Sequence, residues 1–194
     1  MSDFVYAEAM QGWPDWQQEY RYGVLLIYPP APLRSSVNRL RARHDPTSHA
    51  GCEAHISLTV PFPRPVDAEA WEELQGLASR VDPIEITYGP LRHYLPHPGV
   101  CLAIDPQGQL EALLETLESA SVFTGATPRR HRFSAHMTVA EFIDADQTRR
   151  LMDQLSSSAP SGRFVCREVA YAVPDEGFSF KPQGVLMLGR ATGG

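Results

Sequence analysis

The sequence has few cysteines, and they are not arranged as a framework. Its 194 residues contain only Cys52, Cys101 and Cys166, and no CxxC pair occurs. An odd number of widely spaced thiols argues against both a disulfide framework and a zinc site. We therefore expect a protein of a reducing compartment, the cytoplasm.

Long apolar runs and an excess of positive charge are also missing. No stretch approaches the roughly 20 apolar residues needed to span a bilayer, and the N-terminus, with Asp3 and Glu8, lacks the apolar core of a secretory signal. The formal net charge of −6 argues against binding of long nucleic acid duplexes, because such binding depends on neutralising many phosphates. We expect a soluble protein without membrane contact, with room for one small phosphate pocket.

What is present is the composition of an ordinary globular protein, with 43% hydrophobic and 21% charged residues. The length fits one compact domain, or two small lobes that share a core. Residues 1–21, with Trp13 and Trp16, show no clear period, and we predict that they form an N-terminal arm or lid. Residues 22–194 are predicted to form a single domain of two lobes.

Hydrophobic periodicity predicts an alternation of strands and helices. Helices are expected over residues 33–43, 67–80 (capped by Asp67), 109–120 and 144–155. Extended segments are expected over residues 22–28, 52–62, 84–95 (two pieces around Gly89 and Pro90), 99–105, 134–142, 164–173, 178–182 and 184–190. The arginines of 33–43 are expected on its polar face, and residues 44–51 are expected to form a loop. A histidine-bearing strand precedes a helix twice, which predicts an α+β fold of two similar lobes.

The two histidine-bearing strands share a pattern. In HISLTV the alternation of side chains places His55, Ser57 and Thr59 on one face, and in HMTVA it places His136 and Thr138 on one face. The intervening residues are apolar and suit packing against helices. If two lobes meet, the two polar faces line a common cleft.

Two histidines across a cleft suit phosphoester chemistry that proceeds by proton transfer. One neutral imidazole accepts a proton from the attacking group, and a second, protonated imidazole donates one to the departing oxygen, so no metal is required. The hydroxyls of Ser57 and Thr138 would hold the non-bridging oxygens. Only His55 and His136, among seven histidines, have Ser or Thr two places later, which disfavours two unrelated structural histidines.

Other kinds of site are less well supported by the residues. Neither motif has carboxylates or thiolates at metal-ligand spacing, Ser57 lacks a GxSxG context, and no P-loop or dinucleotide fingerprint occurs. The segment PRRHR (128–132) is either a phosphate-binding patch or a solvated loop. Trp13, Trp16 and Phe62 either stack on a base or pack internally, and core packing is favoured for Phe62.

The ordered pair HISL and HMTV, together with the run RLRARHDP…HISLTVPF, resembles the two-histidine (2H) phosphoesterases, among them the 2′-5′ RNA ligase-like and RNA cyclic phosphodiesterase proteins. The likeness covers the chain from about Tyr22 to Arg190. It implies a bilobal fold with pseudo-twofold symmetry, in which antiparallel-rich sheets carry outer helices and enclose a central cleft.

The resemblance also implies an activity and its residues. It implies opening of 2′,3′-cyclic phosphates on RNA ends or small nucleotides without a metal. We expect a monomer without a cofactor. His55 and His136 would be catalytic, one assisting the attacking water and the other protonating the leaving ribose oxygen, and Ser57 and Thr138 would bind substrate. Related alternatives are hydrolysis or ligation of a 2′-5′ linkage, and non-catalytic binding of phosphorylated nucleotide ends.

Two positions depart from the family pattern. Ser57 stands where threonine is more usual, and Glu141 stands five places after the second histidine, where several members carry arginine. A carboxylate cannot hold phosphate, so the favoured substrate is open, and Arg132 is a candidate replacement.

Overall fold

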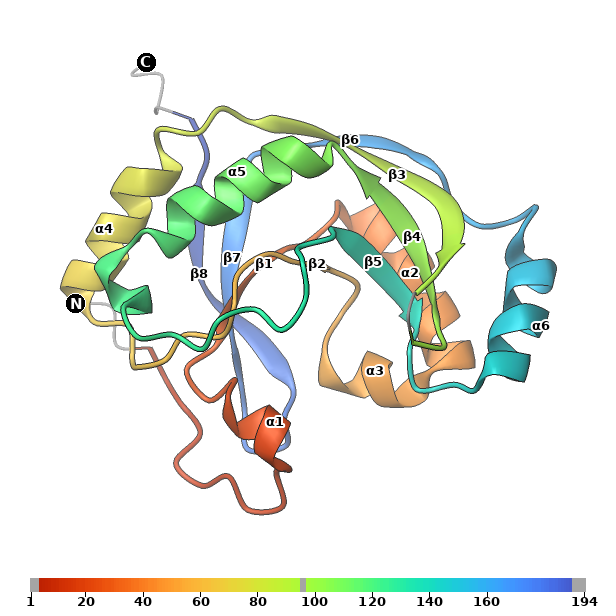
Figure 1. Cartoon of the computed structure of the whole chain (residues 1–194), viewed down its shortest axis with the longest axis horizontal. Helices are drawn as coiled ribbons and strands as arrows, with labels where there is room; N and C mark the ends of the chain where they lie inside the picture. The colour runs from red at the N-terminus through yellow and green to blue at the C-terminus, as the bar shows by residue number, and fades with distance from the viewer. Residues whose placement is uncertain (1–3, 95–96, 190–194) are drawn as a thin grey trace.

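The structure, a computed structural model, describes residues 4–94 and 97–189. Leu95 and Arg190, at the ends of two predicted strands, and residues 1–3 of the predicted arm lie outside the described residues. Within the described residues, eight strands form one antiparallel sheet in the order β6-β3-β4-β5-β2-β1-β7-β8 (Figure 1). The strands are β1 (Val24–Ile27), β2 (Ile56–Ser57), β3 (Ile84–His93), β4 (Val100–Asp105), β5 (His136–Ala140), β6 (Gly162–Cys166), β7 (Glu168–Pro174) and β8 (Phe180–Met187).

Six α-helices accompany the sheet in the described residues. They are α1 (Asp15–Gln18), α2 (Ala31–His44), α3 (Pro46–Gly51), α4 (Ala68–Ala78), α5 (Gln107–Glu118) and α6 (Ala145–Leu155). Four of them, α2, α4, α5 and α6, were predicted from the sequence. Asp67 caps α4 as expected, since its carboxylate accepts the N–H of Ala70 at 2.9 Å. No helix among the described residues has the length and apolarity needed to cross a membrane.

The sheet consists of two lobes that meet at its centre. One lobe contains β6-β3-β4-β5 and the other β2-β1-β7-β8, and they are joined where Ile56 of β2 pairs with Met137 of β5. The predicted α+β fold is confirmed, with each histidine-bearing strand at the inner edge of its lobe.

The two faces of the sheet differ in how they are buried. The main core unites side chains of α2, α4, α5 and α6 with one face, including Ile56 and Met137, both fully buried. A smaller cluster on the other face includes Val24, Leu26 and Ala172, with Tyr20 and other aromatic residues packed on it. The alternation of side chains places His136 of β5, and His55 directly before β2, on this second face.

Four predicted segments differ from the structure. The segment 52–62 is a strand only at β2, Ile56–Ser57, and His55 directly precedes it. Residues 44–51 are helical at α3 because Asp45 caps the N–H of Ser48 and Pro46 fits a first-turn position. The two pieces around Gly89 and Pro90 form one strand, β3, whose pairing register shifts there. The segments 178–182 and 184–190 contribute to one strand, β8, whereas 164–173 is divided into β6 and β7.

The expected polar face of α2 is wrong at Arg41, which is only 2% exposed. It lies one turn after the buried Val37 and so continues the inward-facing stripe. Its guanidinium donates to the carbonyls of Thr138 (2.9 Å), Ser48 (2.8 Å) and Cys52 (3.0 Å). One charged side chain therefore ties α2 and α3 to the second histidine strand.

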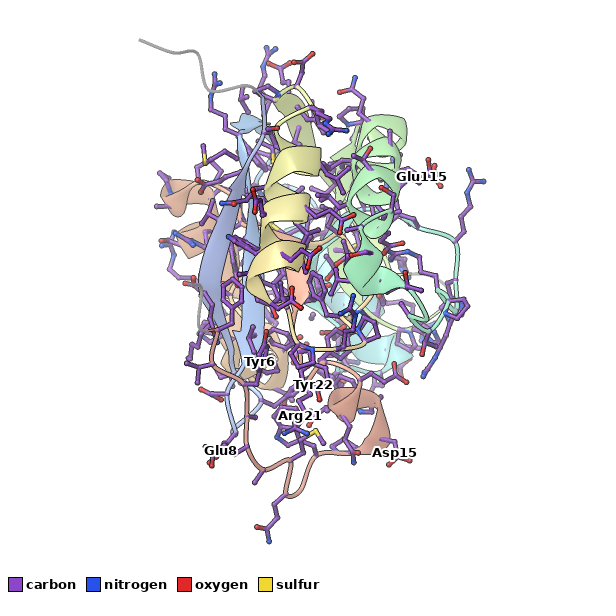
Figure 2. The ribbon with its side chains drawn as sticks, turned by 90° about the vertical axis from the view of Figure 1, so that its left-hand side faces the viewer. Tyr6, Glu8, Asp15, Arg21, Tyr22 and Glu115 are labelled. Atoms are coloured by element: carbon purple, nitrogen blue, oxygen red, sulfur yellow. The ribbon has the colours of Figure 1, made fainter. Side chains whose placement is uncertain are left out.

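Residues of the predicted arm pack against β7 and β8. The ring of Phe4 makes edge contacts with Trp71 and Tyr171, at centroid distances of 5.0 and 4.8 Å. Tyr6 and Tyr22 lie beside each other (Figure 2), and their ring centroids are 5.5 Å apart. The buried Trp13 donates its indole N–H to the carbonyl of Glu176 at 2.9 Å. Phe4, Tyr6 and Tyr22 thus pack against the main core, whereas Tyr20, just after α1, packs on the small cluster of the other face.

Replacement of Arg41 by alanine is expected to destabilise the fold strongly. It leaves three carbonyls without their buried donor, which should lower the free energy of unfolding by about 3 kcal/mol or more. Urea unfolding of Arg41→Ala measures this, and Arg43→Ala, at an exposed position of the same helix, should stay within about 0.5 kcal/mol of the parent. Equal effects of the two variants would contradict the buried role.

Candidate active site

The two histidine motifs meet on adjacent strands. Because Ile56 pairs with Met137, the antiparallel register sets His55 opposite Thr138 and Ser57 opposite His136. Directly opposed residues share a face of the sheet, and their Cβ atoms lie about 5 Å apart. Figure 1 shows β2 and β5 side by side at the centre of the molecule. The structure therefore brings all four predicted site residues together.

The two imidazoles are held in the same way. Nδ1 of His55 lies 2.7 Å from the carbonyl of Glu53, and Nδ1 of His136 lies 2.7 Å from the carbonyl of Ser134. A carbonyl only accepts hydrogen bonds, so each Nδ1 carries a proton and each Nε2 of the neutral ring is a proton acceptor. Both rings present the same nitrogen for chemistry.

The backbone before each histidine is fixed by an amide side chain from a helix. Asn38 of α2 accepts the N–H of Ala54 at 2.7 Å, and Gln107 of α5 accepts the N–H of Ala135 at 2.8 Å. These positioning residues were missed in the sequence analysis. The repeated Ala-His dipeptide was a signal of the similarity, but the helical partners are distant in sequence and follow no common spacing.

Burial disfavours the charged form of both histidines. It lowers the pKa of His55 to about 4, and the nearby Arg41 guanidinium acts in the same direction. Burial also lowers the pKa of His136 below its ordinary value. Without a bound anion, both rings are therefore neutral at pH 7.

The hydroxyls of the motifs have different surroundings. Ser57 is exposed and Thr138 is half-buried beside the histidines. Thr59, which was predicted to share their face, is buried, and its hydroxyl accepts the N–H of Leu25 at 3.1 Å. Because β2 ends at Ser57, the hydroxyl of Thr59 takes the place of a strand partner for the N–H of Leu25 in β1.

Glu141, which stands where several family members carry arginine, is hydrogen-bonded to residues at and just after the junction of α2 and α3. Its carboxylate accepts a hydrogen bond from the hydroxyl of Ser48, and its N–H donates to the carboxylate of Asp45 at 2.8 Å. Its negative charge favours protonation of both His55 and His136. Glu141 therefore stabilises positive charge at the site.

Tyr94 is a further residue that the sequence analysis missed. Its ring lies 4.6 Å from that of His136, centroid to centroid, in an edge arrangement. Burial raises the pKa of the Tyr94 phenol, so it stays neutral and is available as a hydrogen-bond donor. Tyr94 directly follows β3, and no motif in the sequence indicated this contact.

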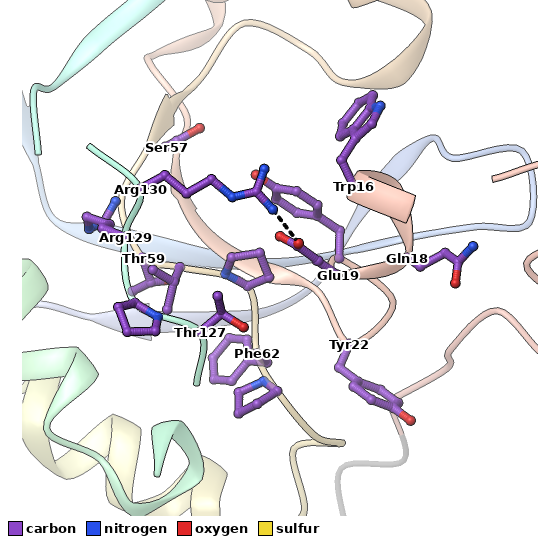
Figure 3. A pocket seen from close by; sticks show the side chains of 15 residues that line it. Trp16, Gln18, Glu19, Tyr22, Ser57, Thr59, Phe62, Thr127, Arg129 and Arg130 are labelled. Carbon is purple, nitrogen blue, oxygen red and sulfur yellow. Dashed lines mark hydrogen bonds and ion pairs between the residues drawn. The ribbon is translucent and has the colours of Figure 1, made fainter. Parts of the chain in front are cut away.

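Two pockets adjoin the histidine strands. The first, called the arm pocket, has a volume of about 500 Å³ and is drawn in Figure 3. It is formed by Trp16 and Gln18–Tyr20 with Tyr22, by Ser57 and residues 59–63, and by residues 127–130. The second, of about 390 Å³, is lined by Arg92, Asp105, Gln107, Glu111, Arg132, Phe133 and Ser134. The candidate Arg132 thus shares this pocket with Ser134, whose carbonyl holds the ring of His136.

The aromatic and basic residues that the sequence offers for substrate binding differ in burial and in their ion pairs. Trp13 and Phe62 are buried and pack internally, whereas Trp16 is 44% exposed. In the basic segment, Arg129 pairs with Glu118 at 2.8 Å and Arg130 pairs with Glu19 at 2.6 Å. Among the described residues, no group of three or more His, Cys, Asp or Glu side chains is placed to hold a metal ion.

The arrangement of a two-lobed antiparallel sheet with paired histidine motifs corresponds to a known family. The sequence matches the model of the 2′-5′ RNA ligase superfamily over residues 29–177. This match covers more than half of the chain, and the protein belongs to this family of 2H phosphoesterases. No curated protein matches the sequence.

Solved structures show the same fold. E. coli LigT in complex with 3′-AMP is 20% identical, with a TM-score of 0.59 over 85% of this chain and 96% of that one. LigT in complex with NADP+ is 21% identical, with a TM-score of 0.56 over 86% and 96%. The protein TT0787 of Thermus thermophilus is 13% identical, with a TM-score of 0.56 over 87% and 98%. At these identities the likeness shows the fold alone.

The lowered pKa of His55 makes a prediction about stability. Between pH 6.5, near the unfolded pKa, and about 4, the unfolded chain binds more protons, so stability falls as the pH falls. From pH 7 to 4.5 the parent should lose about 2 kcal/mol more than His55→Gln, measured by urea unfolding. The control His93→Gln, at an exposed ring, should lose as much as the parent. Identical losses in parent and His55→Gln would contradict the burial of this ring.

Proposed function

We propose that this protein is a metal-independent phosphodiesterase that opens 2′,3′-cyclic phosphates of RNA ends or small nucleotides by two-histidine acid–base catalysis. The observation that carries the proposal is the shared orientation of His55 and His136. Each ring has its Nδ1 committed to a backbone carbonyl, and both lie on one face of adjacent strands. Membership of the 2′-5′ RNA ligase superfamily supports phosphoester chemistry, and LigT complexes with 3′-AMP and NADP+ support a nucleotide ligand.

The proposed reaction needs one neutral and one protonated ring. The neutral Nε2 accepts a proton from water as the water oxygen forms a bond to phosphorus. The protonated Nε2 of the other ring donates its proton to the 2′ or 3′ ribose oxygen as that P–O bond breaks. Both proton transfers are made by imidazoles, so the mechanism requires no metal. An anionic phosphate at the site raises the pKa of both rings and so supplies the protonated one.

We assign His55 as the base and His136 as the acid. Arg41 lies close enough to His55 to oppose its charged form, and burial already holds its pKa at about 4. Ser57 and Thr138, opposite His136 and His55, would donate hydrogen bonds to the non-bridging oxygens. Glu141 would favour the imidazolium that forms during turnover.

A second candidate activity within the family is hydrolysis or ligation of a 2′-5′ linkage. Membership of the 2′-5′ RNA ligase superfamily supports it, and the same pair of imidazoles would serve, because ligation from a cyclic phosphate is its opening by a ribose hydroxyl in place of water. A non-catalytic binder would leave two similarly oriented imidazoles without a role.

The central experiment is hydrolysis of 2′,3′-cyclic AMP in EDTA. His55→Ala and His136→Ala should each lower kcat by about 10²–10⁴-fold, the usual contribution of a positioned acid or base. His93→Ala, at an exposed position in β3, is the matched control and should retain parent activity. Full activity in either site variant, or a requirement for added divalent metal, would contradict the mechanism.

The pH dependence of kcat/KM should be bell-shaped and displaced to acid. His55 must be neutral, which sets the acidic limb near pH 4, and His136 must be protonated, which sets the basic limb below pH 6.5. The kcat profile should extend to higher pH, because bound phosphate raises the pKa of His136. Initial rates from about pH 3.5 to 8.5 at constant ionic strength measure both profiles. A kcat/KM that is still rising above pH 7 would contradict a mechanism that needs one of the two rings protonated.

A further inference from the structure

The arm pocket is formed both by residues within the family match and by residues that precede this match in the sequence. Trp16, Glu19 and Tyr20 come from the segment before residue 29, where the family match begins, and they face residues 127–130 across the pocket. Ser57 lies at its edge, and the strand register sets Ser57 opposite His136. Ser57 therefore links the pocket, which neither histidine lines, to the histidine pair. Its volume of about 500 Å³ lies in the range of small-ligand sites and suits a nucleotide.

The arm supplies an aromatic surface to this pocket. Edge contacts hold the indole of Trp16, with Phe178 at 5.4 Å and Tyr20 at 6.4 Å between ring centroids. The side chain nevertheless stays 44% exposed. A fixed, exposed aromatic ring beside a phosphate site is suited to stack on a nucleobase, because every base presents a π face.

The opposite wall of the pocket contains one arginine, Arg130, whose ion-pair partner a ligand can replace. Arg129 is fixed by the carbonyl of Leu58 at 2.7 Å and by Glu118 at 2.8 Å. Arg130 instead pairs with Glu19, and the dashed line in Figure 3 crosses the pocket between these two side chains. Both are exposed, and an exposed ion pair contributes little to stability. A phosphate, which arginine binds in a bidentate manner, can therefore displace the carboxylate.

We propose that the arm pocket is the nucleoside subsite of the enzyme. The base of the terminal nucleotide stacks on Trp16, and Arg130 exchanges Glu19 for the 5′-phosphate of that nucleotide while the cyclic phosphate lies at His55 and His136. The inference rests on the proposed function and narrows it. The favoured substrates carry both a base and a 5′-phosphate, as the end of an RNA strand does.

Three substrates separate the base from the 5′-phosphate. They are glycerol 1,2-cyclic phosphate, 2′,3′-cyclic AMP and its 5′-phosphorylated form. Trp16→Ala should lower kcat/KM about tenfold for both nucleotides and leave the glycerol compound unchanged, and Trp16→Phe should restore most of the loss. Equal effects on all three substrates would show a structural role of Trp16 and overturn the stacking role.

A second set of variants tests whether the 5′-phosphate replaces Glu19 at Arg130. Arg130→Ala should lower kcat/KM about tenfold for the 5′-phosphorylated nucleotide only, and Glu19→Gln should raise it severalfold for the same substrate. Arg149→Ala, which removes an arginine from another exposed ion pair on α6, should change none of the three values. A loss of activity in Glu19→Gln equal to that in Arg130→Ala would indicate that the ion pair only supports the fold, and would contradict the exchange.

Failure of the proposed function is distinguishable from failure of the subsite. If the parent turns over the three substrates equally and Trp16→Ala and Arg130→Ala change nothing, the phosphodiesterase stands and the subsite is wrong. If the parent turns over none of them, calorimetric binding of adenosine 3′,5′-bisphosphate decides the subsite separately. Weaker binding to both variants than to Arg149→Ala supports the subsite, and equal binding overturns it.

Discussion

The arrangement of the protein depends on one short contact, the pairing of β2 with β5. This contact joins the two lobes into one sheet at the pair Ile56–Met137. It buries these two apolar side chains in the main core and turns the residues on either side of them to the opposite face. A slip of one residue would exchange the apolar and polar faces, so burial of Ile56 and Met137 fixes the register of the histidines.

The surroundings of that pair then determine its chemistry. Each histidine follows an alanine whose N–H is held by a helical amide side chain, Asn38 or Gln107, so the two lobes position their rings by equivalent means. Burial keeps both rings neutral, while Glu141 lowers the cost of charging them. The carboxylate of Glu141 stands at the position of a family arginine, and the arginines near the site line the two pockets instead, Arg129 and Arg130 in one and Arg92 and Arg132 in the other.

Local patterns were enough to predict most elements and the shared faces of four polar residues. Strand alternation indicated the shared faces of His55 with Ser57 and of His136 with Thr138, and the structure brings them together. Contacts between distant segments were not predictable. The burial of Arg41 is satisfied by carbonyls on three other segments, and the helical turn at α3 depends on the cap by Asp45. The pocket formed by the arm likewise requires segments more than 100 residues apart to meet, as Glu19 and Arg130 do.

The central claim is that two imidazoles from two lobes serve one phosphate. NMR observation of the His55 and His136 ring resonances during titration with 3′-AMP tests it most directly, with pKa values measured before and after saturation. The account predicts that both rings respond with one dissociation constant and that both pKa values rise from their lowered values. A response of only one ring, or two different dissociation constants, would show that the histidines do not form a common site.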